Sequence, residues 1–194
     1  MTADVAAARQ IAEAVTDPEL PMLTLADLGI LRDVTCENGH IVVTITPTYS
    51  GCPALREIAC DLQHRLTLAG FAGSTVRTQI APAWTSDWIT PDGRRKLHAA
   101  GIAPPNPAAA GAPPPRGPVP LNLIMAPRDP VACPQCGSLD TAATAAFGAT
   151  ACKALLRCGT CHEPFEYVKE FWWPARGPRR GPSFIRSPCS GWTR

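Results

Sequence analysis

Apolar positions along the first hundred residues recur at two different periods. Where they recur every three to four residues they predict amphipathic helices, and where they alternate with polar positions they predict strands. In chain order these patterns predict a helix at residues 5–15, strands at 29–36 and 41–47, a helix at 53–69, a strand at 74–80 and a helix at 91–99. The sequence therefore predicts a small mixed α/β (α+β) domain of α-β-β-α-β-α order.

Turn residues support several of these boundaries. Asn38-Gly39 lies between the first two predicted strands and indicates a type I′ hairpin, which needs positive φ at both central residues. Pro53 suits the first position of the second helix, and Gly70 suits its end.

Composition changes abruptly after residue 100. Ten of the 22 prolines fall within residues 101–130, and a segment of that composition does not form a packed core. We therefore expect an α/β domain over residues 1–100, a Pro-rich linker over 101–130, a cysteine-rich module over 131–171 and a disordered basic tail over 172–194.

The formal net charge of +2 hides an uneven distribution. Residues 172–194 hold five arginines and no acid, so the rest of the chain has 13 basic against 16 acidic residues. An acidic body argues against nucleic-acid binding, which needs positive charge on a folded face. The sequence has no apolar run of about 18 residues. It also lacks the basic start and apolar stretch of a secretory signal, so we expect a cytoplasmic protein without membrane contact.

Five of the nine cysteines cluster between residues 133 and 161. Cys133 with Cys136 and Cys158 with Cys161 form two C-x₂-C pairs that are 21 residues apart. Four thiolates in two such pairs are typical of a tetrahedral site for zinc or iron. A module of about 40 residues buries too little apolar surface to fold alone, so the metal would supply its folding energy. The sequence thus predicts a Cys₄ zinc-ribbon module with a structural metal and no open catalytic position.

Cys152 is a fifth thiol that lies shortly before the second pair. Three roles are open for it: an extra metal ligand, a redox-active neighbour of the ribbon, or a small buried apolar residue.

Cys52 is placed by the Gly-Cys-Pro sequence at the start of the second predicted helix. The helix dipole would lower the pKa of a thiol there and favour a nucleophile or soft-metal ligand. Cys52 could equally cap the helix or pack under a loop. Asp17 and Glu19, after the first helix, are candidate ligands or plain turn residues. We expect their loop and the loop at 81–88 to gather at one end of the sheet. With no base partner for Cys52, no Ser-His-Asp set and no phosphate loop, a self-contained enzyme is disfavoured.

Several motifs support a family resemblance: DPELP at 17–21, DLG at 27–29, TPTYSGCP at 46–53 and APAWT at 81–85. They resemble the small iron–sulfur assembly domain of the SufT and cytosolic-assembly type. They are followed by CPQC at 133–136, FGATACKAL at 147–155 and CGTCHEPF at 158–165. In this order the two sets resemble the PaaD (or PaaJ) family, the accessory subunits of phenylacetyl-CoA epoxidase.

The resemblance implies a role in aerobic phenylacetate degradation, as an accessory or maturation subunit of the ring-1,2-phenylacetyl-CoA epoxidase. Such a subunit would assist assembly of an iron or iron–sulfur centre in the oxygenase or its reductase without being catalytic itself. By this resemblance Cys52 and Asp17 correspond to the family's Gly-Cys-Pro cysteine and leading acid.

Implied cofactors are a structural zinc and a transient iron ion or iron–sulfur cluster. Implied partners are the oxygenase and reductase subunits, with iron–sulfur assembly proteins in addition. Two alternatives stay open: a structural or regulatory subunit without metal delivery, and a zinc-ribbon protein that binds nucleic acid.

Overall fold

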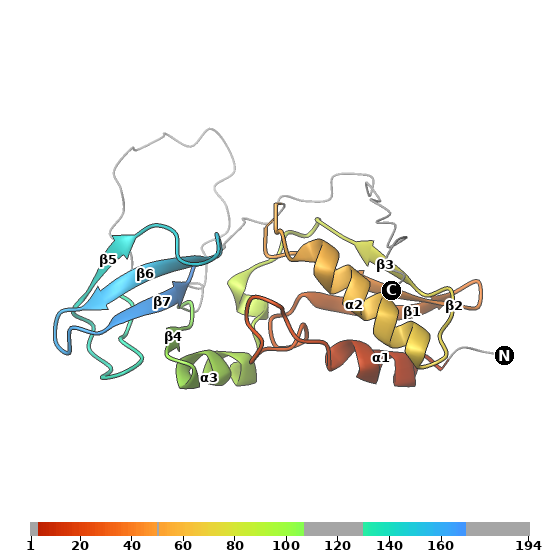
Figure 1. Ribbon diagram of the computed structural model, residues 1–194, viewed down its shortest axis with the longest axis horizontal. Helices are drawn as coiled ribbons and strands as arrows, with labels where there is room; N and C mark the ends of the chain where they lie inside the picture. The colour runs from red at the N-terminus through yellow and green to blue at the C-terminus, as the bar shows by residue number, and fades with distance from the viewer. Residues whose placement is uncertain (1–3, 50, 107–129, 170–194) are drawn as a thin grey trace, which may run out of the picture.

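The computed structural model describes residues 4–49, 51–106 and 130–169. Its elements are α1 (Val5–Glu13), β1 (Leu31–Glu37), β2 (His40–Ile45), α2 (Leu55–Leu68), β3 (Thr75–Thr78), η1 (Ser86–Trp88), α3 (Pro91–Ala99), β4 (Ile102–Ala103), β5 (Thr141–Ala145), β6 (Lys153–Cys158) and β7 (Pro164–Val168). The order from α1 to α3 confirms the predicted α+β fold class. Figure 1 shows the two sheets side by side along the long axis of the molecule.

The N-terminal sheet has the strand order β1-β2-β3, with β1 antiparallel and β3 parallel to the central β2. Helices α1 and α2 contact each other and this sheet. The hairpin between β1 and β2 has positive φ at Asn38 (52°) and Gly39 (82°), as its Asn-Gly sequence predicts. Of the helices described here, none has the length and apolar character needed to cross a membrane.

Helix α2 begins later than its sequence predicts. Its first helical residue is Leu55 and its N-cap is Ala54, which has no side-chain hydrogen bond. Cys52 lies before the helix, in a turn where its N–H donates to the carbonyl of Tyr49 at 3.2 Å. Pro53 is therefore not the first helical residue, because this turn still occupies the chain at that point.

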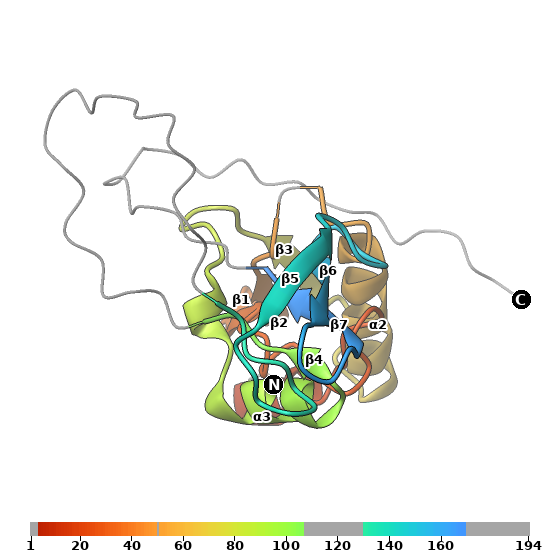
Figure 2. The same ribbon diagram turned by 90° about the vertical axis from the view of Figure 1, so that its left-hand side faces the viewer.

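The C-terminal sheet has the order β4-β7-β6-β5 and draws its edge strand from the N-terminal part of the chain. Strand β4 follows α3 almost directly, and its residues Ile102 and Ala103 pair in parallel with Glu166 and Tyr167 of β7. The linker expected over residues 101–130 thus begins with a strand. Its remainder over 107–129 and the tail expected over 172–194 lie outside the described residues. In Figure 2 this sheet faces the viewer.

Two hydrophobic cores hold the molecule, and the larger one extends into the second sheet. It includes Ile102 of β4 and Val168 of β7 together with the buried residues of α1, α2 and the first sheet. The smaller core lies inside the ribbon and comprises Ala103, Val131, Cys133, Ala154, Leu156, Cys158, Phe165 and Tyr167. Because β4 and β7 reach both lobes, the ribbon is fixed against the N-terminal domain.

Gly29 is a position where this packing requires glycine. It has φ of +67°, and an added Cβ would lie 2.5 Å from the Cβ of Trp88 and 2.6 Å from its carbonyl oxygen. Gly70 also has positive φ (+91°), but an added Cβ there would meet nothing within 4 Å.

We expect Gly70→Ala to lower the free energy of unfolding by about 1 kcal/mol, the cost of a left-handed backbone. Gly29→Ala should lower it by about 2–4 kcal/mol, because steric overlap adds to the same backbone cost. Urea denaturation of both variants measures the difference. Equal losses of unfolding free energy in the two variants would show that overlap with Trp88 adds nothing to the cost.

Candidate metal centre and interdomain cavity

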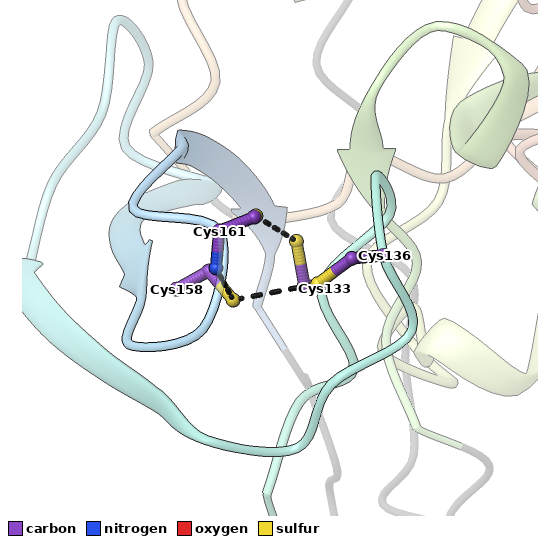
Figure 3. Close-up of side chains that lie close together, drawn as sticks. All are labelled: Cys133, Cys136, Cys158 and Cys161. Atoms are coloured by element: carbon purple, nitrogen blue, oxygen red, sulfur yellow. Dashed lines mark hydrogen bonds between the residues drawn. The ribbon is translucent and has the colours of Figure 1, made fainter.

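The four cysteines of the two C-x₂-C pairs converge at one end of the ribbon, and all their Sγ atoms lie within 4.8 Å of one another. Figure 3 shows the side chains pointing inward, with Cys133 Sγ 3.7 Å from Cys161 Sγ and Cys136 Sγ 3.6 Å from Cys158 Sγ. A tetrahedral zinc with Zn–S bonds of about 2.3 Å requires Sγ–Sγ separations of about 3.8 Å. The four thiols therefore fit a zinc ion.

Charge within this cluster also favours a bound cation. The backbone N–H groups of Cys161 and Thr160 lower the pKa of the Cys158 thiol to about 6. The N–H of Glu163 favours the Cys161 thiolate, but burial and the other thiols outweigh it and raise the pKa of Cys161 to about 12. The four sulfurs do not all ionise together unless a cation compensates their charge.

Cys152 lies outside this cluster. It immediately precedes β6, whereas Cys158 ends that strand, and six residues at about 3.3 Å each separate them by about 20 Å. The Cys152 side chain is buried, and its Sγ lies 3.0 Å from Thr150 Oγ1. The structure thus places this thiol at the opposite end of the ribbon from the four cysteines.

A cavity of about 20 Å³ lies where the ribbon meets the N-terminal domain. Its ionisable lining groups are Asp17, Glu19, Cys52 and Cys152. The loop of Asp17 and the loop that contains Trp84 both reach it, so the two loops expected to gather do so. The Trp84 indole N–H donates to the carbonyl of Leu28 at 2.8 Å and holds the ring as part of the wall.

Burial dominates the electrostatics of this cavity. Asp17 is 7% exposed, and its Oδ1 accepts N–H groups from Glu19 (2.8 Å) and Leu20 (3.0 Å). Burial nevertheless raises its pKa above the usual range. Burial, and then the Asp17 charge, also raise the pKa of Glu19. The Asp17 carboxylate therefore disfavours ionisation of Glu19.

Cys52 departs from the expectation that a helix dipole lowers its pKa. Burial raises the pKa of this thiol, and the charges of Glu19 and Asp17 raise it further. The N–H groups of Ala54 and Leu55 act in the opposite direction but are outweighed. The prediction of a low-pKa thiolate is therefore wrong for the protein without a bound cation.

Family models match both lobes of this structure. Residues 6–77 match a model described as an iron–sulfur cluster assembly protein, and residues 120–169 match the PaaD zinc beta ribbon domain. A putative 1,2-phenylacetyl-CoA epoxidase subunit of Escherichia coli (strain K12) is 43% identical over 157 residues, covering 80% of this chain and 86% of the relative. The chain belongs to the PaaD family of epoxidase subunits.

Other similarities cover only the N-terminal lobe of this PaaD family member. An Fe-S protein maturation auxiliary factor of Porphyromonas gingivalis is 29% identical over 85 residues, or 43% of this chain and 80% of the relative. A crystal structure of a domain of unknown function from Bacillus anthracis is 28% identical, with a TM-score of 0.44, and covers 48% of this chain and 90% of that one.

Lys153 of this PaaD family member is a cavity neighbour that the sequence analysis missed. It is 5% exposed, and its Nζ pairs with Glu166 Oε2 at 2.7 Å. Its positive charge favours the ionised forms of Asp17, Glu19 and Cys152. Nothing in the local sequence marks a lysine in the ribbon as a neighbour of carboxylates more than a hundred residues earlier.

Asp17 and Asp27 are both buried, but their pKa values shift in opposite directions. Burial would raise the pKa of Asp27, yet hydrogen bonds from Lys96 (2.7 Å) and the Thr24 N–H (3.0 Å) lower it. Its contribution to stability is thus present at neutral pH and lost as pH falls through its folded pKa. For Asp17, whose pKa is raised, stability falls as pH rises from its unfolded toward its folded pKa.

We therefore expect Asp17→Asn to raise the melting temperature at pH 7, because Asn keeps the Oδ1 acceptor and removes the buried charge. Asp27→Asn should lose about 1–2 kcal/mol at pH 7, because it weakens a charged hydrogen bond. Thermal unfolding at pH 4 and pH 7 measures both. A drop in stability for Asp17→Asn at pH 7 would contradict the burial argument.

Loss of one cluster cysteine should remove the ribbon metal. We expect Cys133→Ser to lose bound zinc and β structure, because the small ribbon core itself contains Cys133 and Cys158. Cys152→Ser should keep the zinc. Cys36→Ser, at an exposed thiol, should keep it as well. Metal analysis with far-ultraviolet circular dichroism tests this, and full zinc content in Cys133→Ser would refute the four-cysteine site.

Proposed function

We propose that this chain is an accessory subunit that assists assembly of an iron or iron–sulfur centre for a phenylacetyl-CoA epoxidase. The observation that carries the proposal is the cavity of acids and thiols between an iron–sulfur-assembly segment and a PaaD-type ribbon. The names of the two relatives support it, one as an epoxidase subunit and the other as a maturation auxiliary factor.

The size of the cavity favours metal handling over catalysis on an organic substrate. A volume of about 20 Å³ accommodates one water or one ion. Pockets for organic ligands usually enclose about 300–1,000 Å³. The ribbon cluster is a closed set of four thiols without an open position for a substrate. Both features agree with a subunit that supports the oxygenase and does not itself bind phenylacetyl-CoA.

Cys52, Asp17 and Glu19 would hold iron as cargo. Thiolates and carboxylates together suit a divalent iron ion, which accepts both soft and hard ligands. The raised pKa values of these groups mean that protons compete with the metal. Such competition weakens retention, which suits a centre that is passed on. Zinc in the ribbon would be structural.

The recipient we propose is the iron–sulfur reductase of the epoxidase system or its iron-containing oxygenase, and the donors would be iron–sulfur assembly proteins. All of these encounters would take place in the cytoplasm. The two carboxyl and two thiol side chains in the cavity lining support this direction of transfer, because they are potential ligands for iron.

The test is co-expression of the reductase with either the wild-type chain or Cys52→Ser. We expect the variant to keep its zinc and fold but to lower iron and acid-labile sulfide in the purified reductase several-fold. Cys36→Ser is the matched control, because Cys36 is an exposed thiol in β1 away from the cavity lining. Normal reductase cluster content with Cys52→Ser would overturn the proposal and favour a purely structural subunit.

A further inference from the structure

Cys52 and Cys152 belong to different domains and lie a hundred positions apart in the sequence. Both side chains nevertheless line the same cavity. The same causes raise the pKa of both thiols. Burial has the largest effect, and the charges of Glu19 and Asp17 add to it. Asp17 and Glu19 are thus close enough to act on a thiol of each domain. The cavity therefore has a donor set that neither domain has alone.

The backbone around Cys152 holds it in that place. The Cys152 carbonyl accepts the N–H of Lys169 at 2.9 Å, directly beyond β7. The preceding residue, Val168, belongs to the main hydrophobic core and lines the cavity as well. Because β7 also pairs with β4, which follows α3, Cys152 is anchored to the N-terminal domain at two points.

Asp17 gives the cavity an oxygen that the described residues leave without a hydrogen-bond partner. Its Oδ1 accepts both backbone N–H groups, whereas no described donor reaches Oδ2. The residue is only 7% exposed and lines the cavity. Oδ2 is not a fully buried atom, so it is available to a cation or a water in the cavity.

We propose that Cys152 is a ligand of a single divalent iron ion in this cavity, together with Cys52 and the Asp17–Glu19 loop, so that the site is built from both domains. This proposal rests on the proposed function in taking iron as the ion. It gives the ribbon a second role, because the ribbon then supplies a thiol to the N-terminal domain as well as holding zinc.

A single ion agrees with the cavity volume of about 20 Å³, which holds one water-sized sphere. Binding releases the thiol protons of Cys52 and Cys152 to solvent, and the cation offsets the charges left behind. Lys153, fixed by Glu166 beside the cavity, offsets a further part of that charge.

The ribbon cysteines and the cavity side chains differ in how close together their ligand atoms lie. Among the described residues, the ribbon cysteines form the group whose ligand atoms all lie within 4.8 Å of one another. The cavity donors form no such group, so an ion must draw them together, which agrees with transient rather than permanent occupancy.

The experiment is anaerobic titration of the reduced, zinc-loaded full-length chain with Fe²⁺, followed by metal analysis after gel filtration and by thiolate-to-iron charge-transfer absorption. We expect wild type to bind one iron in addition to its zinc. Cys152→Ala should keep the zinc but lose more than about tenfold in iron affinity, since even outer-shell changes at metal sites cost about 10–100-fold. Cys36→Ala, at an exposed thiol, should match wild type.

Equal iron affinity in Cys152→Ala and wild type, or no iron binding by the zinc-loaded wild type, overturns the proposal. Retained zinc in Cys152→Ala shows that the ribbon is folded, so weak iron binding is then not a folding defect. Failure here is separable from failure of the proposed function, which is judged by the reductase clusters formed with Cys52→Ser. Lost iron affinity with normal reductase clusters leaves the site standing and removes the maturation role.

Discussion

The pairing of β4 with β7 is the constraint on which the arrangement of the molecule depends. Two residues, Ile102 and Ala103, join a strand that lies more than sixty positions later in the chain. Their pairing places Val168 in the main core and brings the end of β7 against the N-terminal domain. The cavity exists because of this contact, since Cys152 and Val168 form its ribbon side and Cys52 and Asp17 its other side.

That same contact creates an electrostatic problem. It buries carboxylates and thiols together, and burial raises the pKa of each of them. One buried lysine, Lys153, acts in the opposite direction but is already paired with Glu166. A protein that only needed a stable interface would place apolar residues here, because unpaired buried acids lower stability. The acids and thiols at this interface agree with the proposal that a cation binds between them.

Local sequence was sufficient to predict the turns and helices that depend only on neighbouring residues. Asn38-Gly39 predicted its hairpin, and the helix predicted at residues 91–99 agrees with α3 (Pro91–Ala99). The placement of Cys152 beside Cys52 could not be predicted, because it depends on a strand pairing between distant segments. The pKa of Cys52 was mispredicted for a related reason: the helix N-terminus is a local feature, whereas burial in the folded molecule is not.

The ribbon cysteines and the proposed cavity site place opposite demands on the fold. The ribbon cysteines already have the spacing that a tetrahedral ion needs, so zinc can act as a permanent brace for a core of only eight residues. The cavity thiols have raised pKa values, so protons would compete with the proposed ion there. Strand β6 connects the two, with Cys158 at its end and Cys152 just before its start. In the proposed arrangement, zinc would brace the strand that presents Cys152 to the cavity.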